Sequence, residues 1–204
     1  MLHARLNLIT ADPVLLGESV RYIESEVRPA VERLPGNLGM SLLANPESGV
    51  AVLESFWVSH NALLDSENAV ATARGEMARR VKGPLTAECY RIPVFEREAP
   101  LRGGEGIRLT RMEAGRAAFE DAVEGFGDTA VPWLAETAGF RGALLFADPA
   151  SGHLISETVW QDPAALAASP SAAAVARAIG VDTADCVIRA VEEYILVFSS
   201  ARKA

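Results

Sequence analysis

One segment of this chain is duplicated, and that internal duplication constrains the fold more than any other feature of the sequence. Residues 36–66 and residues 139–169 align without a gap at a constant offset of 103. About a dozen of about thirty aligned positions are identical, among them a Gly-x-x-Gly start, a Pro-x-Ser-Gly turn, a glutamate and a tryptophan. The duplication predicts two structural units of similar architecture within the 204 residues.

The first copy predicts the order strand, helix, strand, strand, helix, strand. Alternation favours a strand over residues 4–10, and Asp12-Pro13 is typical of a helix start, with Pro29 kinking or ending the regular part. A hairpin follows, with strands at 40–44 and 50–58 joined by an Asn-Pro-x-Ser-Gly turn. Ser66 is expected to cap a second helix over 67–81, and the strand over 89–95 contains Pro93, which indicates an edge or a bulge.

The second copy repeats this order, with Arg108 at the position of Arg5. Its expected helices cover about 117–137 and 169–179, and glycines at 125 and 127 should make the first less regular. We therefore predict an α+β protein of two ferredoxin-like (βαββαβ) repeats, at residues 1–96 and 107–204, with a linker at 97–106.

Each predicted sheet has helices on one face only and leaves an apolar face bare. In the first copy that face includes Val50, Val52 and Phe56 or their pleat neighbours, which are too apolar to leave in water. The nearest partner is the other copy, so the two sheets are expected to pack face to face as an intramolecular α/β barrel. The cavity between the sheets is the expected ligand site.

Composition excludes several classes of function. The net charge is −8 with scattered basic residues, which argues against a nucleic-acid partner. No apolar run approaches the ~20 residues of a membrane helix, and the start does not resemble a signal peptide, so we expect a cytoplasmic protein with no membrane partner. Cys89 and Cys186 look like small buried residues rather than a disulfide or a zinc site.

The sequence also contains no pattern for a common cofactor. No dinucleotide or P-loop fingerprint is present, because Gly103-Gly104-Glu105-Gly106 follows no strand-to-helix turn. His3, His60 and His153 are not spaced with carboxylates as metal ligands, and a surface or capping role is expected. We predict no metal and no cofactor.

The duplicated motifs resemble the dimeric α/β-barrel superfamily that includes the antibiotic biosynthesis monooxygenases. They are Gly36-x-x-Gly39, the Asn45-Pro46-x-x-Gly49 turn and Glu54-Ser55-Phe56-Trp57, with the same set from 139 to 169. In that family two subunits usually build the barrel, so this chain looks like a fused version: a monomer with an internal pseudo-dimer, with further pairing into a homodimer left open. The haem-degrading branch uses a histidine of the second helix, which neither 66–82 nor 169–179 contains.

Two duplicated charged pairs are the first candidates for a site. Arg5 and Arg108 lie on the first strands, and Glu54 and Glu157 lie on the third strands. These strands should be adjacent and antiparallel, so each arginine is expected to face a glutamate across the pleat. Such pairs would orient a polar substrate in the cavity, or they are internal salt bridges with no further role.

Four further positions complete the candidate set. Asn7 has no twin because Thr110 replaces it, and the resemblance implies that an asparagine on this strand lines the pocket. That asymmetry would place a single site in the first half. Trp57 and Trp160 end the third strands, where core packing and substrate contact are the two readings.

The resemblance implies a cofactor-independent monooxygenase acting on a small aromatic or polyketide-like molecule. In this hypothesis Arg5, Asn7 and Glu54 are catalytic: a cation holds the enolate, an amide polarises a carbonyl and a carboxylate acts as base. Arg108, Thr110, Glu157, Trp57 and Trp160 would contact the substrate. The alternative is a non-catalytic small-molecule-binding or stress-responsive barrel, and the cavity volume should discriminate between the two.

Overall fold

The computed structural model describes residues 1–97, 100–179 and 185–202, and the chain divides into two compact units. Unit 1 comprises Met1–Cys89 together with Leu196–Ala204, and unit 2 comprises Tyr90–Ile195. These units differ from two repeats taken in chain order, because the strands β4 (Leu85–Arg97) and β8 (Cys186–Ser199) each begin in one unit and end in the other.

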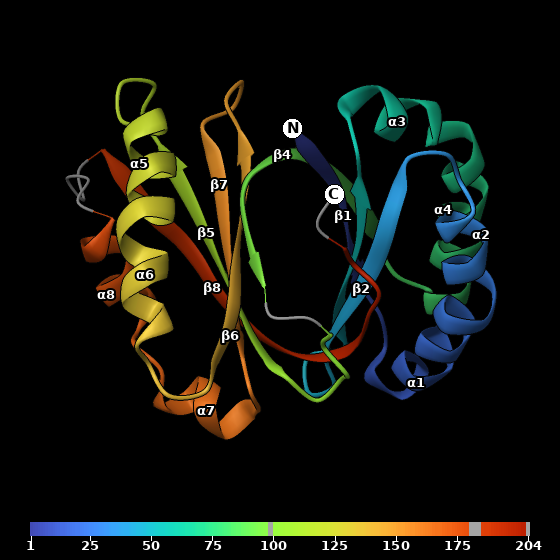
Figure 1. The fold of residues 1–204 in the computed structure, drawn as a ribbon. Helices are drawn as coiled ribbons and strands as arrows, with labels where there is room; N and C mark the ends of the chain where they lie inside the picture. The colour runs from blue at the N-terminus through green and yellow to red at the C-terminus, as the bar shows by residue number, and fades with distance from the viewer. Residues whose placement is uncertain (98–99, 180–184, 203–204) are drawn as a thin grey trace. The chain divides into compact units, whose positions relative to one another are not determined.

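Unit 1 contains a sheet with helices on one face (Figure 1). Its elements, besides the start of β4 and the end of β8, are β1 (Leu2–Thr10), α1 (Pro13–Tyr22), η1 (Ile23–Val27), α2 (Arg28–Glu32), β2 (Asn37–Asn45), β3 (Val50–Trp57), α3 (His60–Asp65) and α4 (Glu67–Val81). Asp12 caps α1 by accepting a hydrogen bond from the backbone N–H of Val14, as its sequence predicts.

Unit 2 repeats this arrangement with shorter helices. Its elements are β5 (Gly106–Ala114), α5 (Phe119–Gly125), η2 (Phe126–Ala130), α6 (Val131–Ala135), β6 (Phe140–Asp148), β7 (His153–Trp160), α7 (Pro163–Ala168) and α8 (Ala172–Ala178), with the end of β4 and the start of β8. The predicted βαββαβ order is therefore present twice.

The strands form one closed antiparallel order. Within each unit the first strand pairs with the third and the third with the second, so both predicted hairpins are confirmed. The order is β1-β3-β2-β8-β5-β7-β6-β4, and it closes as a barrel. The register of β4 against β6 shifts between Arg91 and Val94, so of the two alternatives expected at Pro93, an edge or a bulge, the structure has the bulge.

Two glycines of the duplicated motif are required where a neighbouring strand approaches closely. Gly39 has φ +111°, and a Cβ there would lie 2.3 Å from the carbonyl oxygen of Ser200. Gly142 has φ +156°, and its Cβ would lie 2.6 Å from the carbonyl oxygen of Glu96. Both positions coincide with register shifts, so the recurring glycines mark bulges that receive the last strand of a repeat.

The first helix of each unit contains a wide turn at the same place. Pro29 and Pro132 each follow a five-residue π-helix, η1 in unit 1 and η2 in unit 2. Proline lacks the N–H that would continue the α-helical pattern, and its ring crowds the carbonyl four residues earlier. The helix widens instead of ending, so the predicted kink takes the form of a π turn.

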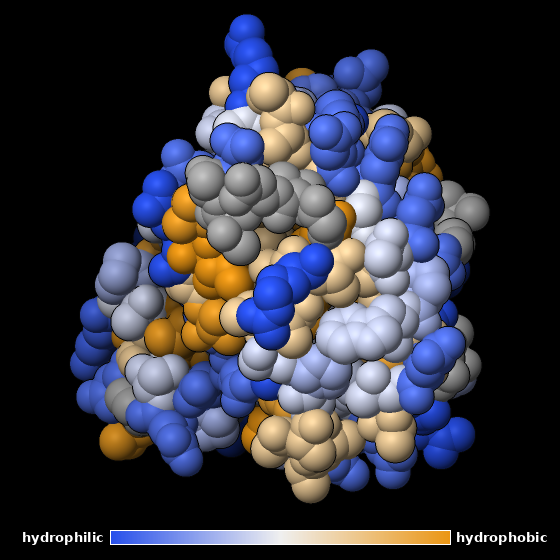
Figure 2. Space-filling view, turned by 90° about the vertical axis from the view of Figure 1, so that its left-hand side faces the viewer, coloured by the Kyte–Doolittle hydropathy of each residue, from blue (hydrophilic) through white to orange (hydrophobic). Residues whose placement is uncertain are grey.

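Each unit buries its main core between the sheet and its helices. In unit 1 this core includes Ile23, Val31, Met40, Leu63 and Met77, and in unit 2 it includes Phe126, Leu134, Leu145 and Leu166. Figure 2 shows hydrophobic surface on one face of unit 2. The exposed large apolar side chains of this unit include Val191 and Ile195, which lie on the same face of β8 as Glu193 between them.

Among the described residues, none of the helices has both the length and the hydropathy that crossing a membrane would require.

Candidate functional site

A narrow pocket lies inside unit 1, between the helix-facing side of its sheet and the helices. Its volume is about 30 Å³. It is mostly apolar, and its lining residues are Arg5, Asn7, Ile9, Val27, Val31, Met40, Leu53, Ser55, Val70, Ala73, Arg74, Met77 and Leu85. A pocket of this size holds one or two water molecules, and a larger ligand requires the walls to move.

Asn7 places an unsatisfied hydrogen-bond acceptor at this pocket. Its side chain is 6% exposed, and its amide nitrogen donates to the carbonyl oxygen of Leu53 at 3.2 Å. That bond orients the amide, and the oxygen Oδ1 is buried without a hydrogen-bond partner among the described residues. An unpaired buried acceptor costs about 1–3 kcal/mol, so a donor supplied by water or a ligand would bind favourably here.

Arg5 lies two residues earlier on the same face of β1 and is mainly an anchor for the helices. Its guanidinium donates to the carbonyl oxygen of Leu63 at 2.9 Å and to the hydroxyl of Ser66 at 3.0 Å, and it pairs with Glu67 at 2.8 Å. The side chain is nearly buried, and its Nε has no hydrogen-bond partner among the described residues. Arg5 therefore joins β1 to the junction of α3 and α4, with one donor left over.

Glu67 links the two arginines of the pocket. Its carboxylate accepts a hydrogen bond from Arg74, which lines the pocket, and pairs with Arg5. The hydrogen bond from Arg74 lowers the pKa of Glu67, burial opposes this shift, and the nearby charge of Arg5 lowers the pKa further. Glu67 is therefore ionised at neutral pH, and it fixes Arg74 at the pocket.

The arginine and glutamate of each repeat do not face each other, which corrects the expected pairs. In β1, Arg5 is opposite Ser55 and Leu6 is opposite Glu54. In β5, Arg108 is opposite Thr158 and Leu109 is opposite Glu157. Neighbouring residues of a strand point to opposite faces, so each arginine lies on the helix side of its sheet and each glutamate on the other side.

Glu54 and Glu157 are both fully buried on this second face. Glu157 pairs with Arg97 of β4, with 2.7 Å between Arg97 Nη2 and Glu157 Oε1. Arg97 is only 4% exposed in its side chain, so this is a buried ion pair inside unit 2. Neither glutamate lines the pocket of unit 1.

Arg108 repeats the anchoring contacts of Arg5 in unit 2. It donates to the hydroxyl of Ser169 at 2.9 Å and to the carbonyl oxygen of Leu166 at 3.3 Å, and it pairs with Glu193 at 2.9 Å. Its near neighbour Thr110 is buried. The duplicated Leu63/Leu166 and Ser66/Ser169 identities therefore preserve an arginine anchor at the broken second helix.

Ser66 has a different role from the expected helix cap. It stands immediately before α4, but its side chain makes no capping hydrogen bond there. Its hydroxyl instead donates to the carbonyl oxygen of Leu63 at 2.7 Å and accepts from Arg5. The buried arginine takes the oxygen that would otherwise accept from the backbone of α4.

Trp57 and Trp160 are completely buried and belong to the two main cores. The indole nitrogen of Trp57 donates to the hydroxyl of Ser55 at 3.1 Å, and that of Trp160 donates to the hydroxyl of Thr158 at 3.1 Å. Neither tryptophan lines the pocket of unit 1. Both tryptophans recur because each packs in the core of its unit and donates the same hydrogen bond to a hydroxyl two residues earlier.

Sequence reasoning missed the helix wall of the pocket. Val70, Ala73, Arg74 and Met77 recur on one face of α4, and Met40 enters from β2. The spacing of three or four residues within 67–81 was a usable signal for the inward face of that helix. What it could not indicate was that this face borders an opening rather than close-packed core.

In the part of the chain that the structure describes, histidines and other metal-ligating residues do not form a larger cluster. Among the described residues no group of three or more His, Cys, Asp or Glu has the geometry to hold a metal ion. His3 and His60 do lie together in unit 1, with ring centres 5.2 Å apart. Burial lowers the pKa of His3, the hydrogen bond with the Met1 carbonyl opposes this, and the proximity of His60 lowers it further.

This lowered pKa predicts a pH-dependent stability. The unfolded chain binds a proton at His3 more readily than the folded one, so the free energy of unfolding should fall as the pH drops through 6.5 and below. Replacing His3 with glutamine should flatten the slope between pH 7.5 and 5.5, measured by urea denaturation. A slope identical to that of the unmodified protein would contradict the assignment.

Comparison with known proteins supports the fold more than any activity. No protein-family model matches the sequence. A relative from Mycobacterium tuberculosis, the uncharacterised protein Rv2558, is 25% identical over 203 residues, covering 99% of this chain and 86% of the relative. A second protein of that organism, Rv2557, is 24% identical over 160 residues, covering 78% of this chain and 71% of its own.

Solved structures match the whole chain. A candidate monooxygenase from Fusobacterium nucleatum has a TM-score of 0.73 at 11% identity, covering 100% of this chain and 95% of its own. An anthrone oxidase-like protein has a TM-score of 0.69 at 16% identity, with coverages of 100% and 95%. This chain has the dimeric α/β-barrel fold. A candidate monooxygenase from Lactobacillus acidophilus shares this α/β barrel, with a TM-score of 0.69 at 14% identity and coverages of 98% and 94%.

Proposed function

We propose that unit 1 is a cofactor-independent monooxygenase that takes an electron-rich hydroxylated aromatic ketone into the pocket beside β1. The observation that supports this most is the pair of unsatisfied groups there: the acceptor Asn7 Oδ1 and the donor Arg5 Nε. They lie on one face of β1, with Cα atoms about 7 Å apart. A hydroxyl and a carbonyl on one aromatic scaffold supply the matching donor and acceptor.

The proposed reaction needs little from the protein beyond binding and orientation. The enolate of an anthrone-like substrate transfers an electron to dioxygen, and the two radicals combine as a hydroperoxide. Loss of water then leaves a new carbonyl: one oxygen atom replaces the two hydrogens of the ring methylene, and the other leaves as water with those hydrogens. The Arg5 cation stabilises the enolate, and Asn7 accepts a hydrogen bond from the substrate hydroxyl.

Two roles differ from those expected from the sequence. The amide nitrogen of Asn7 already donates to Leu53, so its oxygen is the group offered to a ligand. Among the described pocket residues none is a carboxylate, and Glu54 lies on the other face of the sheet. The proton of the substrate is therefore assigned to solvent.

The pocket must widen to admit such a substrate. Ligand sites usually measure about 300–1,000 Å³. Met40 and Met77, both buried, are the wall residues best able to move, because their side chains are unbranched and flexible.

The small pocket volume of about 30 Å³ favours a second candidate function, a non-catalytic barrel that binds a small molecule.

Oxygen uptake distinguishes the two functions. With 1,8-dihydroxyanthrone and a panel of quinols, we expect turnover by the unmodified protein and a loss of about 10- to 100-fold in kcat/KM for Asn7→Ala, the value of one buried hydrogen bond. Thr110→Ala is the matched control at the twin position and should retain activity. Absence of turnover, with binding that Asn7→Ala still weakens, would establish the non-catalytic alternative.

A further inference from the structure

The two units differ sharply where the first and second helices meet. Gly125 closes α5 in unit 2, and a Cβ added there would lie 2.1 Å from the carbonyl oxygen of Ile179, just after α8. The two helix ends are therefore in backbone contact. At the repeat offset of 103, the residue that corresponds to Gly125 is Tyr22, the last residue of α1.

In unit 1 an aromatic ring occupies this helix junction. Tyr22 is partly buried against the core, and the guanidinium carbon of Arg80 in α4 lies 4.1 Å from the centre of its ring. Arg80 also pairs with Glu76 of the same helix at 3.0 Å. At the position that glycine takes in unit 2, unit 1 thus carries a tyrosine ring with an arginine stacked on it.

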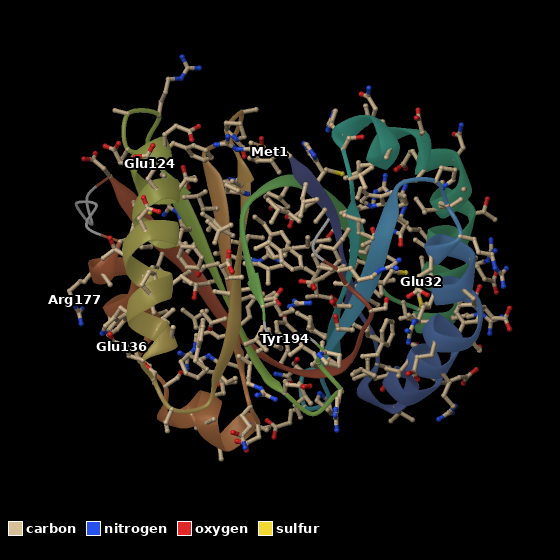
Figure 3. All side chains as sticks on the ribbon, viewed as in Figure 1. Met1, Glu32, Glu124, Glu136, Arg177 and Tyr194 are labelled. Atoms are coloured by element: carbon tan, nitrogen blue, oxygen red, sulfur yellow. The ribbon has the colours of Figure 1, made fainter. Side chains whose placement is uncertain are left out.

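The core side chains next to this junction are larger in unit 2 than in unit 1. Phe126 and Leu134 of unit 2, both fully buried, replace the smaller Ile23 and Val31. The second helix of unit 2 is largely alanine, which allows a close approach to the sheet. Arg74 of α4 lines the pocket of unit 1, whereas Arg177 of α8 is exposed and points away from unit 2 (Figure 3).

We propose that Tyr22 is the spacer that holds α4 off the sheet and keeps the pocket open, and that Gly125 commits unit 2 to close packing. The proposed ligand site thus lies in the half that carries Asn7. The identity of the ligand rests on the proposed function, but the claim about packing does not. Tyr22 acts here as a positioning residue, since it is not among the residues that line the pocket.

Xenon binding tests the spacer without relying on any reaction, because the gas enters apolar cavities in protein interiors. In crystals under xenon pressure, we expect a bound atom in the unit 1 pocket for the unmodified protein and for Tyr22→Phe, which keeps the ring. Occupancy should fall at least tenfold in Tyr22→Gly and partly in Tyr22→Leu. Equal occupancy across the series would overturn the proposal.

Binding of 1,8-dihydroxyanthrone, followed by fluorescence, should weaken at least tenfold in the same order. If xenon occupancy falls in the Tyr22 variants as expected but the anthrone binds to none of the proteins, the spacer role of Tyr22 is supported and the proposed function is wrong. If the anthrone binds equally to all variants, the spacer role of Tyr22 is wrong and the proposed ligand class is supported.

The unit 2 half of the proposal has its own matched pair. Gly125→Ala should lower the unfolding temperature, because the added methyl meets a backbone oxygen that cannot rotate away. Gly75→Ala in α4 is the control, since a Cβ there meets no atom within 4 Å, and it should leave the temperature unchanged or raise it. A Gly125→Ala protein as stable as the control would contradict the close packing.

Discussion

Replacing Arg97 with methionine is expected to lower the free energy of unfolding by about 3–5 kcal/mol, the usual cost of breaking a buried ion pair. The carboxylate of Glu157 is fully buried and accepts from Arg97 at 2.7 Å, while its second oxygen has no hydrogen bond among the described residues. Removing the arginine leaves a buried negative charge without its main partner. Chemical denaturation of Arg97→Met measures the loss directly.

Arg91 provides a matched control on the same strand. Its distance to Glu120 is also 2.7 Å, but the glutamate side chain is 63% exposed. Arg91→Met should therefore cost no more than about 1 kcal/mol. Adding Glu157→Gln to Arg97→Met should recover part of the loss, because the remaining side chain is neutral. A loss at Arg97 no larger than that at Arg91 would show that the buried pair contributes little.

Replacing Arg5 with methionine is the second change with a large expected effect, also about 3–5 kcal/mol from several charge-assisted hydrogen bonds. The arginine joins β1 to Leu63, Ser66 and Glu67, at the junction of two helices. Its removal frees the start of α4, which is one wall of the pocket. Differential scanning calorimetry and urea denaturation measure the loss.

Arg108→Met is the control for the anchor in unit 2. Arg108 makes the equivalent contacts to Leu166 and Ser169, so a loss of similar size is expected there, with no effect on ligand binding in unit 1. Arg5→Lys keeps the charge without the planar fork and should recover only part of the stability. If Arg5→Met remained fully stable but lost oxygen uptake, Arg5 would act on the substrate and not as an anchor.

The candidate site shows where sequence reasoning succeeds and where it stops. Asn7 could be selected because Thr110 breaks the repeat at that position. Asn7 lines the pocket of unit 1 and its buried oxygen has no hydrogen-bond partner among the described residues, but its role on a substrate stays a prediction. Arg5 and Glu54 were chosen as a facing pair because their strands are adjacent, but register places them on opposite faces. A shift of one residue changes the face of every side chain on a strand, and a short strand pattern does not encode that shift.

The amino-acid sequence alone determined the duplicated βαββαβ order, the hairpins and the irregular helices before Pro29 and Pro132, because these follow from local chemistry and from the repeat itself. Tertiary structure alone decided that the duplicated arginines anchor helices, that Glu157 meets Arg97, and that a pocket lies between sheet and helices of unit 1. These outcomes depend on how segments far apart in the chain pack. The space between a helix and a sheet is set by contacts such as that of Tyr22 with Arg80, which no local pattern records.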